Sequence, residues 1–101
     1  MKDFKILLVC SGGMSTSILM KKMEAYAKEH DFNLEIEAVG MGVYKDIAAN
    51  YDIMLLGPQI AYRKKSIEET VDMPVVAIAP QDYAFGNSEK IFKQVEAVLG
   101  E

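Results

Sequence analysis

The chain has 101 residues, a net charge of −4 and a single cysteine. This length is typical of one domain with one core, and a lone cysteine excludes an intramolecular disulfide and a multi-cysteine metal site. The acidic balance argues against nucleic acid or an anionic membrane as a partner. No apolar run could span a bilayer, and the N-terminus lacks the features of a signal peptide. We therefore expect one cytoplasmic domain over residues 1–101, without direct membrane insertion.

Short apolar runs alternate with helical patterns along the whole chain. We expect strands at 4–9, 34–39, 53–56 and 75–78, because these segments are short and rich in apolar residues. The first and third contain unbroken apolar stretches, which indicates burial on both faces. The second alternates with period two, which indicates one face in water and a place at the edge of the sheet.

Helical periodicity predicts four helices between these strands. The first runs from Thr16 to about His30, and the second covers 43–50 with Val43 and Ile47 facing inward. The third follows 59–62 and ends near residue 70. We expect a loop at 79–87, because it contains Pro80 and Gly86. The last helix starts near Ser88, and its expected inner side chains are Ile91, Phe92, Val95, Val98 and Leu99.

Alternating strands and helices predict an α/β fold. Right-handed crossovers would join the strands into a single four-stranded parallel sheet with helices on both faces. Because the second strand suits an edge, we expect the order 2-1-3-4. In such sheets ligands bind beyond the carboxyl ends of the strands where the order reverses, here between the first and third strands. Residues 10–17 and 57–59 both leave the sheet at this point.

Cys10 stands between the first strand and the first helix, and the residues that follow it are Ser11, Gly12, Gly13, Met14, Ser15, Thr16 and Ser17. The glycines allow a tight turn and close approach to a ligand, and the hydroxyl residues suit a helix start. N–H groups at a helix N-terminus bind anions and favour a thiolate. A cysteine at a strand end is often only a small buried side chain. Its glycine- and hydroxyl-rich surroundings instead indicate a phosphate-binding loop with Cys10 as nucleophile.

Other cysteine and phosphate motifs fit less well. A nucleotide P-loop needs a lysine, which residues 6–20 lack, and a redox site of the thioredoxin type needs a second cysteine. His30 is about 20 Å from Cys10 along the helix, too far for a Cys/His pair. The phosphatase pattern C-x5-R would require arginine where Thr16 stands, and the only arginine is Arg63. The sequence therefore favours transfer of a phosphoryl group over its hydrolysis.

The segment 10–17, together with Leu-Leu-Gly-Pro-Gln-Ile-Ala-Tyr at 55–62, resembles enzyme IIB of the bacterial phosphoenolpyruvate-dependent sugar phosphotransferase system. Within that system the chain is similar to the lactose/cellobiose (diacetylchitobiose) class over its whole length. The resemblance implies a flavodoxin-like domain, akin to low-molecular-weight phosphatases. It also implies that Cys10 accepts a phosphoryl group from a phosphohistidine of a IIA phosphocarrier protein. The acceptor would be a sugar held by a membrane-embedded IIC transporter, a β-linked disaccharide such as cellobiose, chitobiose or lactose.

The resemblance assigns roles to individual residues as well. Cys10 would be the phosphorylated nucleophile and residues 11–17 its phosphate cradle, with Gln59 and Tyr83 approaching from the loops after the third and fourth strands. We expect neither a metal ion nor a cofactor. Two alternatives remain open: a cysteine-dependent phosphatase or arsenate-reductase-like enzyme, and a non-catalytic phosphate-binding regulatory module.

Overall fold

A computed structural model of the chain describes residues 3–10 and 14–100. The side chains of Met14 and Ser15 are outside this description as well. The elements, in chain order, are β1 (Asp3–Val9), α1 (Met14–Glu29), β2 (Asn33–Val39), α2 (Tyr44–Ile47), η1 (Ala48–Asn50), β3 (Ile53–Leu56), η2 (Pro58–Arg63), α3 (Lys64–Glu68), β4 (Val75–Ala77), α4 (Pro80–Phe85) and α5 (Ser88–Leu99). Two of them, η1 and η2, are short 3-10 helices.

The four strands form one parallel sheet in the order β2-β1-β3-β4. This confirms the order expected from the sequence. Strand β1 pairs along its whole length with β2, from Asp3 opposite Asn33 to Val9 opposite Val39, and its second half also pairs with β3. On β2 the exposed residues alternate with half-buried ones, as the period-two pattern predicted.

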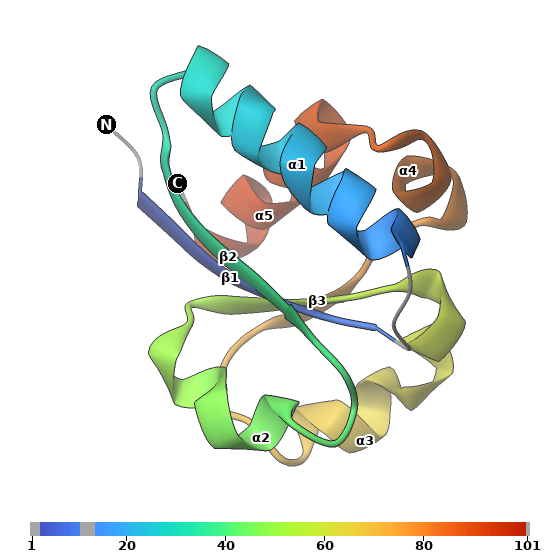
Figure 1. Ribbon diagram of the computed structural model, residues 1–101. Helices are drawn as coiled ribbons and strands as arrows, with labels where there is room; N and C mark the ends of the chain where they lie inside the picture. Colours follow the sequence, from blue (N-terminus) through green and yellow to red (C-terminus); the bar gives the residue numbers. More distant parts are fainter. Residues whose placement is uncertain (1–2, 11–13, 101) are drawn as a thin grey trace.

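The helices cover both faces of the sheet, with α1, α4 and α5 on one side and α2 and α3 on the other (Figure 1). Successive side chains of β1 point to opposite faces. Ile6 and Leu8 therefore belong to the core under α1 and α5, whereas Leu7 and Val9 belong to the core above α2 and α3. All four are fully buried, which confirms the predicted central position of this strand.

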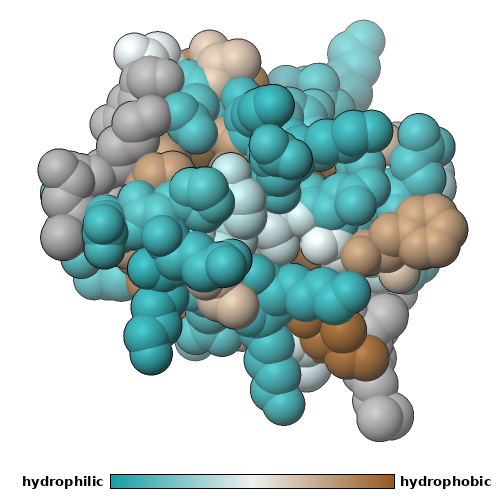
Figure 2. Space-filling view, turned by 90° about the horizontal axis from the view of Figure 1, so that it is seen from above, coloured by the Kyte–Doolittle hydropathy of each residue, from teal (hydrophilic) through white to brown (hydrophobic). Residues whose placement is uncertain are grey.

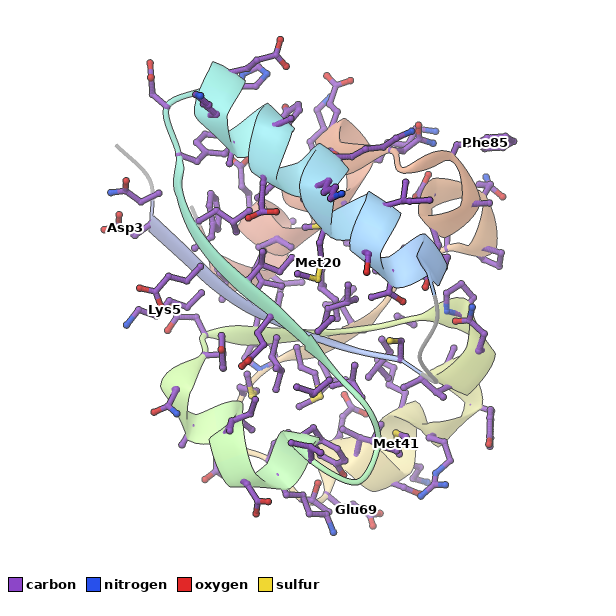
Figure 3. All side chains as sticks on the ribbon, in the orientation of Figure 1. Asp3, Lys5, Met20, Met41, Glu69 and Phe85 are labelled. Carbon is purple, nitrogen blue, oxygen red and sulfur yellow. The ribbon has the colours of Figure 1, made fainter. Side chains whose placement is uncertain are left out.

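A group of aromatic rings fills the core at the end of the sheet where β1 begins. Phe4 lies edge-on to Phe32 at 5.2 Å and 5.4 Å from Phe92, and Tyr26 stacks on Phe92 at 5.3 Å between ring centroids. Met20 points into the same layer from α1 (Figure 3). Seen from above, over α1, the surface is mostly hydrophilic, with hydrophobic patches near its margin (Figure 2). One end of the molecule thus depends on aromatic packing, and the opposite end carries the carboxyl ends of the strands.

The loop expected at 79–87 is wrong, because residues 80–85 form the helix α4. Its first residue is Pro80, whose fixed φ suits the first turn and whose missing N–H costs nothing there. Gly86 ends the helix in the left-handed conformation, with φ 62°, and its N–H bonds back to Asp82 and Tyr83. Proline and glycine therefore delimit a helix here instead of interrupting one.

Two inward assignments are also wrong. Val43 precedes α2 and is 49% exposed, because the helix begins one residue later and buries Tyr44 instead. Val98 is 42% exposed, because it lies beside a surface hollow along the edge strand β4.

The third helix is split into η2 and α3 and ends at Glu68. Among the residues described, none of the helices has the length and hydropathy needed to cross a membrane.

Candidate functional site

Cys10 lies at the carboxyl edge of the sheet where the strand order reverses. Its N–H donates to the carbonyl of Val39 at the end of β2, at 3.1 Å. On the other side of β1, the N–H of Gly57 donates to the carbonyl of Val9 at 2.9 Å. The backbone around Cys10 is therefore fixed between both neighbouring strands. The cysteine itself is 4% exposed.

The thiol of Cys10 takes part in a short series of side-chain hydrogen bonds. Thr16, in the first turn of α1, donates from Oγ1 to Cys10 Sγ at 3.2 Å. The same Oγ1 lies 2.6 Å from the hydroxyl of Tyr83 on α4. Thr16 and Tyr83 are 3% and 7% exposed. Thr16 thus connects the sulfur of Cys10 to the hydroxyl of Tyr83, and all three side chains are buried.

Gly57 lies next to Cys10 and Tyr83. A Cβ atom at Gly57 would lie 2.7 Å from Gln59 Oε1, 3.4 Å from Cys10 Cβ and 3.6 Å from Tyr83 Cε2. Gln59 and Tyr83 therefore approach Cys10 from η2 and α4, where the sequence analysis expected them. Gln59 is exposed, whereas Tyr83 is buried. The contact shows only their location; their part in the chemistry stays a prediction.

Helix α4 is held in place at its carboxyl end. Asn87 donates from its backbone N–H to the carbonyl of Asp82 at 2.9 Å and from Nδ2 to the Asp82 carboxylate at 3.1 Å. Lys22, on α1, donates to the carbonyl of Phe85 at 3.2 Å. The ring of Phe85 itself projects away from the helix (Figure 3) and is 70% exposed. The Asn87 bonds close the carboxyl end of α4, and the Lys22 bond ties this end to α1, the helix that carries Thr16.

The structure describes only some of the other residues predicted to form the phosphate cradle. Ser11, Gly12 and Gly13 lie outside the described residues. Met14 begins α1, but its side chain and that of Ser15 are not described either. Ser17 is exposed in the first turn of that helix. The structure therefore brings Cys10, Thr16, Gln59 and Tyr83 together, and the cradle formed by 11–17 remains an expectation.

No basic or metal-binding group completes the site among the described residues. Arg63 is exposed at the end of η2. His30 is exposed at the far end of α1, where its ring stacks on Tyr26 at 4.1 Å. Residues 3–10 and 14–100 contain no group of three or more His, Cys, Asp or Glu side chains that could hold a metal ion. The chemistry available is that of one thiol near a helix N-terminus.

The surroundings of Cys10 suit a nucleophile that carries a phosphoryl group. The hydrogen bond from Thr16 and the nearby N-terminal end of α1 both place positive partial charge close to the sulfur. No local pattern in the sequence predicts the pairing of Thr16 with Tyr83, which lie 67 positions apart. Recognising Pro80 and Gly86 as the ends of a helix would have shown that Tyr83 has a fixed orientation.

The chain is similar in sequence to known proteins of one family over nearly its whole length. Residues 5–94 match the family model of the lactose/cellobiose-specific IIB subunit of the phosphotransferase system (PTS). The chain is 35% identical over 98 residues to the oligo-β-mannoside-specific EIIB component of Bacillus subtilis, covering 94% of this chain and 95% of that protein. It is 33% identical over 107 residues to the galactose-specific EIIB component of Lactococcus lactis, covering 98% and 99%.

The fold agrees as well. The solution structure of the cellobiose-specific phosphotransferase IIB component of Borrelia burgdorferi superposes with a TM-score of 0.79 at 35% identity, covering 97% of this chain and 94% of that one. The sheet order of the present chain, together with this superposition, confirms the flavodoxin-like fold. The match of the family model confirms the resemblance noted in the sequence. The chain belongs to the lactose/cellobiose-specific IIB components of the sugar phosphotransferase system, a family of phosphotransferases.

Proposed function

We propose that this protein is a cytoplasmic phosphoryl carrier, one IIB domain over residues 1–101, whose phosphorylated residue is Cys10. The donor is a phosphohistidine of a IIA protein, and the acceptor is a sugar held by a IIC transporter. The observation that carries the proposal is the hydrogen bond from Thr16 to Sγ at the point where the sheet order reverses. The chain contains no other thiol.

In the first transfer the Cys10 thiolate attacks the phosphorus atom of the IIA phosphohistidine. An S–P bond forms, the P–N bond breaks, and its electron pair stays on the imidazole. In the second transfer a sugar hydroxyl attacks the same phosphorus. The S–P bond breaks with its electrons returning to sulfur, and the hydroxyl proton leaves to a base in the complex with IIC. Thiolate is consumed in the first step and regenerated in the second, so a donor to sulfur assists the departure of Cys10 as a leaving group.

The residue at position 16 supports transfer over hydrolysis. Cysteine phosphatases place an arginine at the corresponding position of C-x5-R, where its two parallel N–H donors hold the phosphoryl oxygens. Here Thr16 is buried and its hydroxyl already bonds Sγ and Tyr83. The single arginine of the chain, Arg63, is exposed on another element. Attack by water therefore gains less stabilisation than it would in a phosphatase.

For the sugar we propose a β-linked disaccharide such as cellobiose, chitobiose or lactose. Support comes from the family, which is named for lactose and cellobiose, and from relatives named for oligo-β-mannosides and cellobiose. A further relative is named for galactose at nearly the same identity. Because similar IIB chains serve different sugars, selection among these sugars is assigned to the IIC partner.

Intact-protein mass spectrometry tests the proposal. After incubation with a phosphorylated IIA protein of this class, the chain should gain the mass of one phosphoryl group, and peptide mapping should place it on Cys10. Cys10→Ser should not gain it, and His30→Ala should gain it as the wild type does. Addition of vesicles that contain IIC and its sugar should then remove it. Labelling of Cys10→Ser, or a phosphoryl group that IIC and sugar do not discharge, would contradict the carrier function.

A further inference from the structure

We propose that Tyr83 is a positioning residue that acts on Cys10 through Thr16. In this arrangement the Tyr83 hydroxyl donates to Thr16 Oγ1, and Thr16 then directs its own proton at Sγ. The inference rests on the proposed function of Cys10 and extends it to a residue on a distant element. The two distances are 2.6 Å from Tyr83 OH to Thr16 Oγ1 and 3.2 Å from Thr16 Oγ1 to Cys10 Sγ.

The direction of the two hydrogen bonds follows from the number of protons. A threonine hydroxyl has one proton to donate and lone pairs to accept with. A thiolate has no proton, so the bond between Thr16 and the Cys10 thiolate requires Thr16 to be the donor. The proton in the 2.6 Å contact must then come from Tyr83. The Tyr83 hydroxyl therefore donates to a lone pair of Thr16 Oγ1, and the single hydroxyl proton of Thr16 remains for the bond to the sulfur.

Without Tyr83, Thr16 Oγ1 would lose the group that occupies its acceptor side. A threonine in a helix divides between two χ1 rotamers, so its hydroxyl would then be held less firmly toward Sγ. Donation from Tyr83 favours the orientation of Oγ1 that reaches Sγ. Hydrogen bonds in series also polarise one another, and the effect is larger away from water. All three side chains are less than 8% exposed, so solvent does not replace either bond.

The fold fixes the tyrosine hydroxyl independently of the thiol. The N–H of Tyr83 donates at 3.0 Å to the carbonyl of Ala79, the N-cap residue of α4, and the Tyr83 ring packs beside Gly57. Lys22 and Asn87 hold the end of this helix, as described above. A change at the Tyr83 hydroxyl should therefore alter the hydrogen bond from Thr16 to the sulfur without moving α4.

Other charged groups on the surrounding elements are directed elsewhere. Asp82 accepts from Asn87, and Glu37 on β2 accepts from Tyr51. The basic side chains on α1 and η2 that are nearest in sequence to the site are exposed: Lys21, Lys22 and Arg63. Tyr83 is thus the titratable group that the described contacts connect to Cys10, through Thr16.

The test is the rate of alkylation of Cys10 by iodoacetamide as a function of pH, which needs neither IIA nor IIC. Tyr83→Phe keeps the ring and removes the hydroxyl, and it should raise the pH midpoint by about 0.5 to 1 unit, the effect of losing part of one hydrogen bond. The matched control is Tyr44→Phe, since Tyr44 is 3% exposed and bonds Thr70 at 3.0 Å on the other face of the sheet. Tyr44→Phe should leave the midpoint unchanged.

A double-mutant cycle separates action through Thr16 from a general effect on structure. Thr16→Val should raise the midpoint at least as much as Tyr83→Phe. Thr16→Ser keeps the hydroxyl, so its midpoint should lie close to that of the wild type. In the Thr16→Val background, Tyr83→Phe should add nothing. Full additivity of the two changes, or equal shifts for Tyr83→Phe and Tyr44→Phe, would overturn the inference.

Replacement of Tyr83 by 3-fluorotyrosine provides a test of the opposite sign, should Tyr83→Phe fold poorly by near-ultraviolet circular dichroism. The more acidic phenol is a stronger donor, so the midpoint should fall; a rise or no change counts against the inference. Transfer from phosphorylated IIA is measured separately on the same variants. A chain that shows the alkylation pattern but accepts no phosphoryl group would refute the proposed function alone, and one that accepts it without the pattern would refute the role of Tyr83 alone.

Discussion

The N–H of Gly57 bonds the carbonyl of Val9 at 2.9 Å, and the space where Gly57 would carry a side chain is occupied by Gln59 Oε1. The backbone of Gly57 is extended, with φ −63° and ψ 152°, so any residue could adopt its conformation. Glycine at this position therefore serves space and not backbone conformation, because a Cβ here would make the Gln59 amide shift. It allows β3 to approach Cys10 closely while the Gln59 amide folds over it.

Gly57→Ala should lower the rate at which Cys10 accepts a phosphoryl group and leave stability nearly unchanged. The new Cβ would displace the Gln59 amide, 2.7 Å away, and would come into van der Waals contact with Cys10 Cβ at 3.4 Å. Because the backbone is not strained, the free energy of unfolding should change by less than about 1 kcal/mol. Acceptance from phosphorylated IIA and urea denaturation measure the two effects. Gly42→Ala is the control, since no atom lies within 4 Å of its Cβ position; equal transfer rates for both variants would show that Gln59 has no part in the reaction.

Gly86→Ala should destabilise the protein by about 1 to 2 kcal/mol, because the left-handed conformation disfavours a side chain. A Cβ at this position also collides with the Lys22 side chain. Gly100→Ala separates the two causes, since Gly100 has φ 77° and open space around its Cβ position. The free energy of unfolding in urea measures both variants. A loss at Gly86 no larger than that at Gly100 would mean that Lys22 moves aside without cost.

Tyr51 should make stability depend on alkaline pH. Its hydroxyl donates to Glu37 Oε2 at 2.8 Å. Burial, then the hydrogen bond to Glu37 and the negative charges of Glu37 and Glu35, raise its pKa above the ordinary value of 10.0. A raised pKa means that the folded state holds this proton more tightly, so the stabilisation is complete below pH 10 and is lost as the pH rises through the folded pKa.

Denaturant unfolding of the wild type and Tyr51→Phe between pH 8 and 11.5 measures this dependence. The difference in unfolding free energy between them should be constant up to about pH 9.5 and shrink above pH 10. Tyr62→Phe serves as the control, because Tyr62 is 80% exposed. A difference that stays constant to pH 11.5 would show that the Glu37 contact does not persist in solution.

The isolated protein should hydrolyse an aryl phosphate such as p-nitrophenyl phosphate at close to the uncatalysed rate. Loss of one preorganised contact to a transition state costs about 3 kcal/mol, or about a hundredfold in rate, and Thr16 provides no guanidinium to the phosphoryl oxygens. Phosphorylated Cys10 should accordingly persist in water for long enough to meet its acceptor. Release of p-nitrophenol measures the first expectation and decay of the phosphoprotein mass the second. Rapid turnover that Cys10→Ser abolishes would instead support a cysteine phosphatase.

The sequence was sufficient to predict the sheet and the position of Cys10. The unbroken apolar run at Ile6–Val9 can only be buried on both faces, and the alternation at 34–39 requires one wet face, so the strand order followed. Cys10 was placed at the carboxyl edge because it directly follows the first strand. These features depend on neighbours in the sequence, and a periodic pattern records them.

The features that were missed depend on contacts between distant residues or on the phase of a helix. Thr16 and Tyr83 meet only because α4 packs against α1, and neither residue carries a local signal of that contact. Val43 was expected to be buried because it is apolar, but the helix starts at Tyr44 and turns that residue inward instead. The helix α4 was missed because proline and glycine occur at the ends of helices as well as in loops, so Pro80 and Gly86 alone do not distinguish the two.

The two cores on opposite faces of the sheet supply different parts of the site. Thr16 and Tyr83 come from the layer of α1 and α4, whereas Gln59 comes from η2, whose Ile60 is buried in the layer with α2 and α3. Cys10 follows a strand whose alternate side chains anchor both layers. The reaction centre therefore lies between the two layers of helices, and its geometry depends on how these layers are positioned relative to each other across the sheet. Loosening either core by a truncated side chain should perturb a different half of the environment of the thiol, so this single sulfur atom can serve as a reporter for the packing of each layer.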